Sequence, residues 1–238
     1  TMKSIKFLFF LVITALIFYL IFREINYLSL REVFLNAKWQ YLAIGALIII
    51  LTQVLSAKKW QAILRAMDYS LSFKDSFKII MAASPASAII PAKAGDLIRA
   101  YYLKDKIPAT RVAGGVVVER LIDISILAFY SFMGAAFLKN WVILGISLSV
   151  ILLVPLFFLV INKIRLPSGK WQERIESFLY TSKIFTKEPK KLLPILFYGA
   201  ILWLSPILAV KVFFLALGTS TPLFYVAAAF PLAIFISL

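Results

Sequence analysis

The sequence contains no cysteine and no histidine among its 238 residues. Without cysteine there are no disulfide bonds and no thiol chemistry. Without either residue there are no zinc sites of the usual kind and no Ser-His or Cys-His nucleophile. Acidic residues are also scarce, with 11 Asp and Glu against 26 Lys and Arg. We therefore predict no catalytic residue, no metal and no cofactor, and any acid–base chemistry would have to use the carboxylates, Lys or Tyr.

Hydrophobic residues, in contrast, are abundant. They make up 62% of the chain, and the mean hydropathy is +0.93, whereas a soluble domain is about half apolar. The excess falls in continuous runs of roughly 17–25 residues, the length that a helix needs to cross a hydrocarbon core. Continuous rather than alternating runs favour helices over a barrel. The predicted fold is an all-α, polytopic transmembrane helix bundle forming a single domain, residues 1–238.

The formal net charge of +15 could indicate a nucleic-acid-binding protein, but we reject that interpretation. The basic residues lie mostly between the apolar runs, where the positive-inside rule and anionic head groups explain them. A nucleic-acid-binding protein would instead carry a basic patch on a soluble domain. Membrane lipids are therefore the expected partners, no nucleic acid is expected, and the oligomeric state is left open.

We predict six spans and one broken or re-entrant element. Lys58-Lys59-Trp60 follows the second span and is interpreted as an interfacial anchor, and residues 58–78 as either an interfacial amphipathic helix or a solvated loop helix. Further aromatic residues are assigned to interfacial belts: Trp39, Trp141, Trp171, Tyr101 and Tyr102. The spans are residues 7–22 (an uncleaved first span rather than a signal peptide), 41–55, 112–138, 141–161, 193–217 and 222–238.

The broken element covers residues 79–99. Its apolar part is short, and Pro85 and Pro91 are predicted to interrupt any helix through it, with Gly95 following. Its many Ala and Ser residues allow close backbone packing. Non-helical backbone at membrane depth is tolerated only where protein or a water-filled cavity covers it, so this segment is expected to enter and leave the membrane on one side.

The distribution of basic residues predicts a plasma-membrane protein whose N-terminus is cytoplasmic. The segments 58–78, 93–111 and 163–192 are rich in Lys and Arg, whereas the turns at 139–140 and 218–221 carry one Lys between them. The chain stops inside an apolar run without a polar flank, so we expect the natural protein to continue beyond residue 238.

Two charged clusters could carry chemistry. Glu119 and Asp123 are four residues apart on one face of a predicted span, and Arg120 lies beside them. Ionisable groups at this depth are costly, so they face protein or water and usually pair. The cluster therefore either binds a charged head group, couples transport to protons, or holds the helix to the broken element as an ion-pair network.

The second cluster ends the broken element. Asp96 and Arg99 are three residues apart and can pair on a helical turn beginning near Gly95, whose free N–H groups would suit an anion. The planar guanidinium of Arg99 suits phosphate. Lys93 is a further candidate for phosphate binding, although a lysine there can also extend to the interface. Lys211, within an apolar run, is assigned to the same head-group site or to an outward-facing position. Gly114-Gly115 is interpreted as a helix-packing notch.

Together the two clusters resemble the flippase-like transmembrane family that includes the membrane domain of lysylphosphatidylglycerol synthase and UPF0104-type membrane proteins. Members typically show Pro-x-x-x-Gly-(Glu/Asp)-x-x-Arg and then Glu-Arg-x-x-Asp, and the resemblance covers most of this chain. Two features of the family are missing: a later Pro/Gly-rich segment ending in Glu, and the soluble transferase domain of the synthase. The matching positions here are Pro91, Gly95, Asp96, Arg99, Glu119, Arg120 and Asp123.

The resemblance implies translocation of an anionic phospholipid or lipid-linked phosphate between leaflets. Arg99 and Arg120 would bind the phosphate, and Glu119 and Asp123 would balance these cations. Three alternatives stay open: a membrane enzyme that modifies a lipid phosphate, with Glu119 or Asp123 as general base, a small-solute transporter, and a scaffold subunit. The missing His and metal-ligand cluster count against the enzyme.

Overall fold

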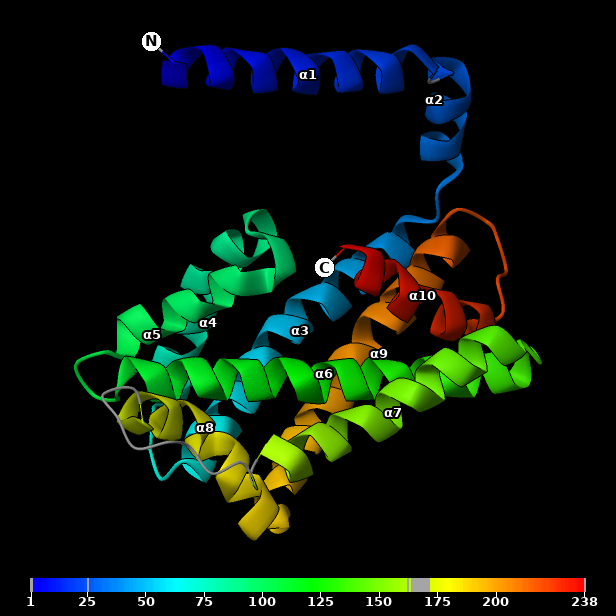
Figure 1. The fold of residues 1–238 in the computed structure, drawn as a ribbon. Helices are drawn as coiled ribbons and strands as arrows, with labels where there is room; N and C mark the ends of the chain where they lie inside the picture. Colours follow the sequence, from blue (N-terminus) through cyan, green and yellow to red (C-terminus); the bar gives the residue numbers. More distant parts are fainter. Residues whose placement is uncertain (1, 25, 162, 164–171, 238) are drawn as a thin grey trace.

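The computed structural model describes residues 2–24, 26–161, 163 and 172–237, and within these ranges it is all-helical (Figure 1). The predicted all-α class is therefore confirmed. The 3-10 helices are η1 (Pro91–Leu97) and η2 (Pro189–Leu192). The α-helices are α1 (Met2–Glu24), α2 (Tyr27–Asn36), α3 (Trp39–Ala66), α4 (Phe73–Ile89), α5 (Ile98–Leu103), α6 (Ala109–Phe137), α7 (Trp141–Ile161), α8 (Gln172–Lys187), α9 (Leu193–Ala216) and α10 (Leu223–Ser237).

Three of the described helices are long and apolar enough to cross a membrane. They are α3, α7, and the continuous helix Pro189–Ala216 formed by η2 and α9. Few residues in their most apolar windows are buried inside the protein, so their side chains are available to acyl chains. The predicted spans 141–161 and 193–217 agree closely with α7 and α9, whereas α3 is longer than the predicted span 41–55.

Helices α3 and α9 pack against each other along their length in antiparallel directions (Figure 1). At one end the backbone N–H of Lys38 donates to the carbonyl of Ala216 at 2.9 Å. At the other end Lys191 Nζ donates to the carbonyl of Ala66 at 3.3 Å. The beginning of α3 therefore lies beside the end of α9, and this pair forms one wall of the bundle.

Helix α6 crosses this pair and packs against α7, α8 and α10. Glycines allow two of these close approaches. A Cβ at Gly114 would overlap the carbonyl oxygen of Phe178 in α8, and one at Gly134 would come within 2.6 Å of the backbone nitrogen of Ala228 in α10. At Gly115, a Cβ would lie 3.2 Å from Met67 Cε. The predicted packing notch at Gly114-Gly115 is therefore confirmed.

The broken element consists of α4, η1 and α5. The expected interruption at Pro85 is wrong, because α4 continues through this residue to Ile89. The interruption at Pro91 is confirmed: Ile90 is extended, and η1 begins at Pro91. The chain then turns back, and η1 packs against α4 (Figure 1). A Cβ at Gly95 would overlap the carbonyl carbon of Ala86 and the nitrogen of Ser87, so this close approach requires glycine.

The interpretation of residues 58–60 as an interfacial anchor is wrong for two of the three residues. Helix α3 continues to Ala66, and the side chains of Lys59 and Trp60 are buried in the bundle. The segment 58–78 is accordingly divided between the last turns of α3 and the beginning of α4 rather than forming a helix of its own. The other described aromatic residues assigned to belts are exposed, and Trp171 lies outside the described residues.

Helix α1 stands apart from the bundle in Figure 1 and is joined to it through α2. The predicted first span, residues 7–22, lies within α1. From Leu11 to Leu20 its side chains are exposed on all sides. A helix that is apolar all round is stable when buried in lipid or protein, so α1 fits an acyl-chain environment.

Candidate functional site

Six charged side chains meet in the centre of the bundle and form a closed ring. We call it the charged ring. Three are cations and three are carboxylates, they alternate around the ring, and their formal charges sum to zero. In order, the ion pairs are Lys59–Glu119 (3.0 Å), Glu119–Arg99 (2.5 Å), Arg99–Asp96 (3.0 Å), Asp96–Arg120 (2.6 Å), Arg120–Asp123 (3.2 Å) and Asp123–Lys59 (2.6 Å).

Four helical elements contribute to the charged ring. Lys59 comes from α3, Asp96 from η1 and Arg99 from α5, while the remaining three residues come from α6. Two of the ion pairs are local, because Asp96–Arg99 and Arg120–Asp123 are each three residues apart on a helical turn. The other four join α6 to residues distant in sequence, so the ring holds both α3 and the broken element to α6.

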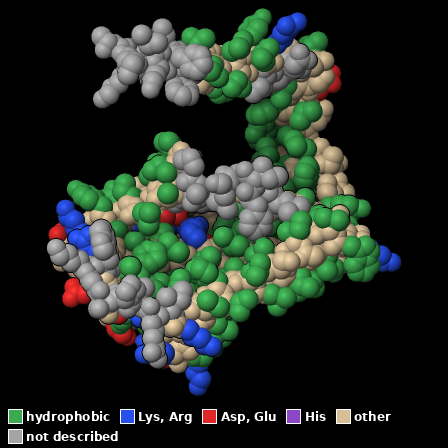
Figure 2. Space-filling view, in the orientation of Figure 1, with side chains coloured by type: hydrophobic (Ala, Val, Ile, Leu, Met, Phe, Trp, Pro, Cys, Tyr) green, Lys and Arg blue, Asp and Glu red, His purple; other side chains and the backbone are tan. Residues whose placement is uncertain are grey.

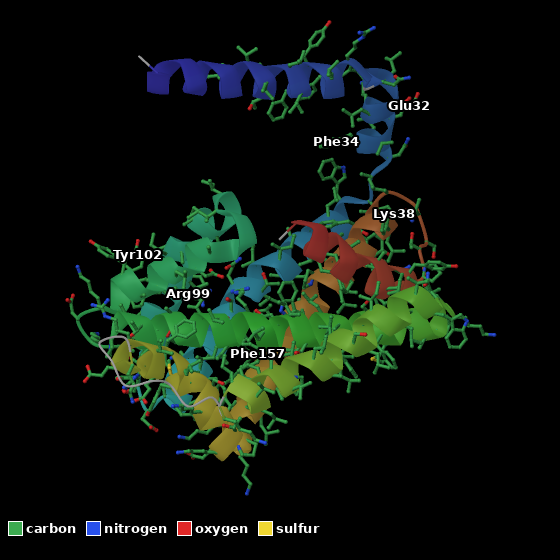
Figure 3. All side chains as sticks on the ribbon, viewed as in Figure 1. Glu32, Phe34, Lys38, Arg99, Tyr102 and Phe157 are labelled. Carbon is green, nitrogen blue, oxygen red and sulfur yellow. The ribbon has the colours of Figure 1, made fainter. Side chains whose placement is uncertain are left out.

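Most of the charged ring is removed from solvent. Glu119 is 0% and Lys59 1% exposed, and isolated charges at such depth would be strongly unfavourable. Neighbours satisfy further groups. Ser87 Oγ donates to Asp96 Oδ1 at 2.6 Å, and the Arg99 guanidinium lies 4.9 Å from the centre of the Trp60 ring. In Figure 3, Arg99 projects from α5 toward α3 and α6.

Five members of the charged ring, all except Glu119, line a cavity of about 370 Å³ between α3, α4, α6, α9 and the start of α5. Figure 2 shows acidic and basic side chains within a hollow that hydrophobic side chains border. Polar residues of α3 recur at helical spacing along one wall, and α9 supplies a largely apolar wall. The residues that line the cavity outside the ring are Ile49, Thr52, Gln53, Ser56, Ile80, Ser84, Ser87, Ala88, Leu202, Trp203 and Pro206.

The two arginines of the charged ring differ in their availability. The Arg99 side chain is 3% exposed and donates hydrogen bonds to both Glu119 and Asp96. The Arg120 side chain is 25% exposed and lines the cavity. The carboxylate oxygens that face Arg120, Oδ2 of Asp96 and Oδ2 of Asp123, have no aligned hydrogen-bond donor among the described residues. Arg120 is therefore the cation that can most readily turn toward a bound anion.

Residues 7–238 match the family described as the lysylphosphatidylglycerol synthase TM region. The chain belongs to this family. Like other members of the lysylphosphatidylglycerol synthase transmembrane family, it is an integral, multi-pass membrane protein.

A curated protein of related sequence is the UPF0104 membrane protein MJ1595 of Methanocaldococcus jannaschii. It is 29% identical over 125 residues, which are 51% of this chain and 37% of the relative. The aligned part thus spans well under half of the relative's length. No solved structure matches this member of the family.

The structure brings together five of the seven predicted site residues of this family member: Asp96, Arg99, Glu119, Arg120 and Asp123. Their role in head-group binding stays a prediction. Lys93 lies in η1, but its side chain is outside the described residues. Lys211 is placed elsewhere, where its ammonium donates to the backbone carbonyl of Thr221 between α9 and α10.

Lys59 is the ring member that the sequence analysis missed. The signal was present, because Thr52, Ser56 and Lys59 recur at helical spacing and all three line the cavity. The two tryptophans that contact or line the site, Trp60 and Trp203, were likewise not assigned to it. Among the described residues, no group of three or more acidic side chains is arranged to hold a metal ion.

Proposed function

We propose that this protein moves an anionic phospholipid, or a lipid-linked phosphate, between the leaflets of the membrane. The observation that carries the proposal is the charged ring lining a cavity between membrane helices. Buried ionisable groups in such helices are costly, and they commonly mark a substrate pathway. In this proposal the cavity holds the head group while the acyl chains stay in the bilayer.

The alternating charges favour a phosphate-bearing head group. Each cation of the charged ring already contacts two carboxylates. A phosphate can take the place of a carboxylate opposite Arg120, because a guanidinium binds either anion through two parallel hydrogen bonds. The phosphate would then replace a carboxylate of the ring as the partner of Arg120, rather than neutralise a surplus positive charge. Because that carboxylate can return to Arg120, the phosphate can be released as well as bound.

The same site can also accept hydrogen-bond donors. Oδ2 of Asp96 and Oδ2 of Asp123 lack aligned donors among the described residues. When Arg120 turns toward the phosphate, these oxygens become available to hydroxyl or ammonium groups on the same head group. The cavity also presents Thr52, Ser56 and Ser84 as further polar partners.

The surroundings suit a lipid rather than a soluble solute. On the face shown in Figure 2, hydrophobic side chains cover much of the bundle next to the hollow. The cavity wall from α9 includes Leu202 and Pro206. Exposed apolar side chains of α3 (Ile44, Leu47 and Leu51) lie on the same helix as the cavity's polar stripe. A head group could occupy the cavity while its chains contact these surfaces.

The proposal includes a topology. Six spans and the re-entrant element α4–η1–α5 would cross or enter a plasma membrane, with the N-terminus in the cytoplasm. The support is the distribution of charge, since Lys and Arg are frequent in residues 58–78, 93–111 and 163–192. Accessibility of single cysteines introduced at residue 105 and residue 140, in a chain that has no cysteine of its own, would test it.

Leaflet exchange in liposomes tests the function directly. The full-length protein would be reconstituted with fluorescent phosphatidylglycerol, phosphatidylcholine or a polyprenyl phosphate, and exchange followed by quenching of the outer leaflet. We expect exchange of an anionic lipid with the unaltered protein and its loss with Arg120→Gln. A matched control is Lys106→Gln, which removes one positive charge from an exposed side chain outside the cavity.

The assay also separates the alternatives. Anionic-lipid exchange that is equal for the unaltered protein and Arg120→Gln would overturn the assignment of the charged ring to the head group. Lipids recovered after the assay would be analysed by mass spectrometry. A covalently modified lipid would indicate a membrane enzyme, and counterflow of a soluble solute in the same vesicles would indicate a solute transporter.

A further inference from the structure

A second, smaller pocket lies between α3 and α9, on a different face of α3 from the charged ring. Its volume is about 230 Å³. We call it the basic pocket. Three of its lining side chains are cationic, and none is acidic. Its lining residues are Lys58, Gln61, Ala62, Arg65, Ala66, Lys191, Pro194 and Tyr198.

Helical periodicity explains why one helix serves both sites. Lys58, Ala62 and Arg65 recur at intervals of four and three residues and share one face of α3. Lys59 lies about 100° further around the helix and points into the charged ring. Consecutive lysines thus face different sites, and the same two helices, α3 and α9, form walls of both.

The two sites differ in how their cations are compensated. Lys58 and Arg65 contact no carboxylate among the described residues, and the Lys58 ammonium instead lies 4.8 Å from the centre of the Phe73 ring. Lys191 lies 3.4 Å from both Asp68 and Glu188. The side chains of these two acids are 72% and 59% exposed and do not line the pocket, so solvent screens their charge.

The pocket lies at the depth where head groups are expected. Its lining residues come from the last turns of α3, from η2 and from the first turns of α9, which are the ends of two candidate spans. Basic pockets between membrane helices near such ends bind anionic lipid head groups. Tyr198 adds a hydroxyl group to the lining, while Ala62, Ala66 and Pro194 leave room at the wall. The amide nitrogen of the buried Gln61 already donates to the carbonyl of Leu71 at 2.7 Å.

We propose that the basic pocket binds the phosphate of an anionic phospholipid that stays in its own leaflet. Lys58 and Arg65 contact the phosphate from α3, and Lys191 contacts it from the other wall. The bound lipid thereby connects the end of α3 to the beginning of α9, next to the contact between Lys191 and Ala66. This inference does not depend on whether the central cavity moves lipid.

Lipid retention by the purified full-length protein tests the proposal. The protein would be extracted from vesicles of phosphatidylglycerol and phosphatidylcholine, and its bound lipids counted by native mass spectrometry. Each Lys or Arg near a head group contributes about 1 kcal/mol, so Lys58→Gln or Arg65→Gln should lower the affinity for phosphatidylglycerol about fivefold, and the double variant about thirtyfold. Lys106→Gln should leave it unchanged, and Lys58→Arg should preserve it because it keeps the charge.

Two results would overturn the proposal. One is equal phosphatidylglycerol retention by the unaltered protein and the Lys58→Gln/Arg65→Gln variant. The other is binding of inorganic phosphate, detected in a parallel titration, without retention of phosphatidylglycerol. Arg120→Gln identifies lipid that is bound in the central cavity rather than in the basic pocket. Lipid that is lost with Arg120→Gln but kept by the double variant belongs to that cavity, and this result would also count against the basic pocket.

Discussion

The ammonium of Lys59 lies 2.6 Å from Asp123 Oδ1, although the two residues are 64 positions apart in the chain. The contact joins α3 to α6 in the interior of the bundle, where both side chains are almost completely buried. Lys59 also contacts Glu119 at 3.0 Å. A single lysine thus neutralises two carboxylates one turn apart on α6, and it holds α3 against that helix.

Replacing Lys59 should destabilise the protein strongly. Lys59→Met leaves two cations facing three buried carboxylates, and removing one partner of a buried ion pair costs about 3–5 kcal/mol. We expect a clearly lower midpoint of thermal unfolding in detergent, measured by intrinsic fluorescence. Lys106→Met is the control, because this lysine is exposed and should leave the midpoint nearly unchanged.

A compensating substitution tests whether the ring acts as a unit. Lys59→Met combined with Asp123→Leu restores equal numbers of cations and carboxylates, so part of the lost stability should return. In a double-mutant cycle the two effects should be less than additive. Simple addition of the two losses would show that Lys59 and Asp123 do not interact.

The two arginines should separate binding from stability. Arg99 is buried and donates hydrogen bonds to two carboxylates, so Arg99→Gln should lower both the unfolding midpoint and lipid exchange. Arg120 is more exposed and faces the cavity, so Arg120→Gln should abolish exchange with a smaller loss of stability. The unfolding midpoint and lipid exchange would be measured for both variants. A lower unfolding midpoint for Arg120→Gln than for Arg99→Gln would contradict this prediction.

Glu119→Gln should alter lipid exchange in a direction set by charge. The ring then has three cations and two carboxylates, and its formal charge becomes +1. An anionic head group should bind more tightly and leave more slowly, so we expect lower exchange at saturating lipid together with stronger retention in native mass spectrometry. Weaker retention by Glu119→Gln than by the unaltered protein would show that head groups do not bind at the ring.

Gly95→Ala should disrupt the broken element. The added Cβ would overlap backbone atoms of Ala86 and Ser87, and backbone cannot move aside as a flexible side chain can. We expect a loss of about 1–3 kcal/mol and reduced exchange, because η1 also carries Asp96. Gly145→Ala is the matched control, since nothing lies within 4 Å of its Cβ and alanine favours the helix by about 1 kcal/mol. Equal unfolding midpoints for the two variants would contradict the close approach of η1 to α4.

Local patterns predicted much of the fold and part of the ring. Continuous apolar runs located α7 and α9, and the spacing of three residues predicted Asp96–Arg99 as a possible contact. These inferences succeeded because they depend on one helix at a time. The Pro91 break followed equally from the missing N–H group and the restricted backbone of proline.

Inferences that depend on a second element were less successful. Lys59 lies beside Lys58 and Trp60, a combination typical of a membrane interface, and only packing against α6 shows that it is buried. Pro85 is an exception of the other kind: it was predicted to interrupt its own helix, yet α4 continues through it. Lys211 is surrounded by apolar residues in sequence like a site residue, but its partner is a backbone carbonyl beyond the end of its helix.

The arrangement of the six charges as a cycle has a consequence for how a ligand can enter. In an open row of ion pairs, each of the two terminal charges has one partner. A terminal charge that loses this partner is left unpaired in a medium of low polarity. A cycle has no terminal member. When one of the six links opens, each of the two released groups still has its other neighbour. Partners can therefore be substituted one link at a time, without any charge passing through an unpaired state.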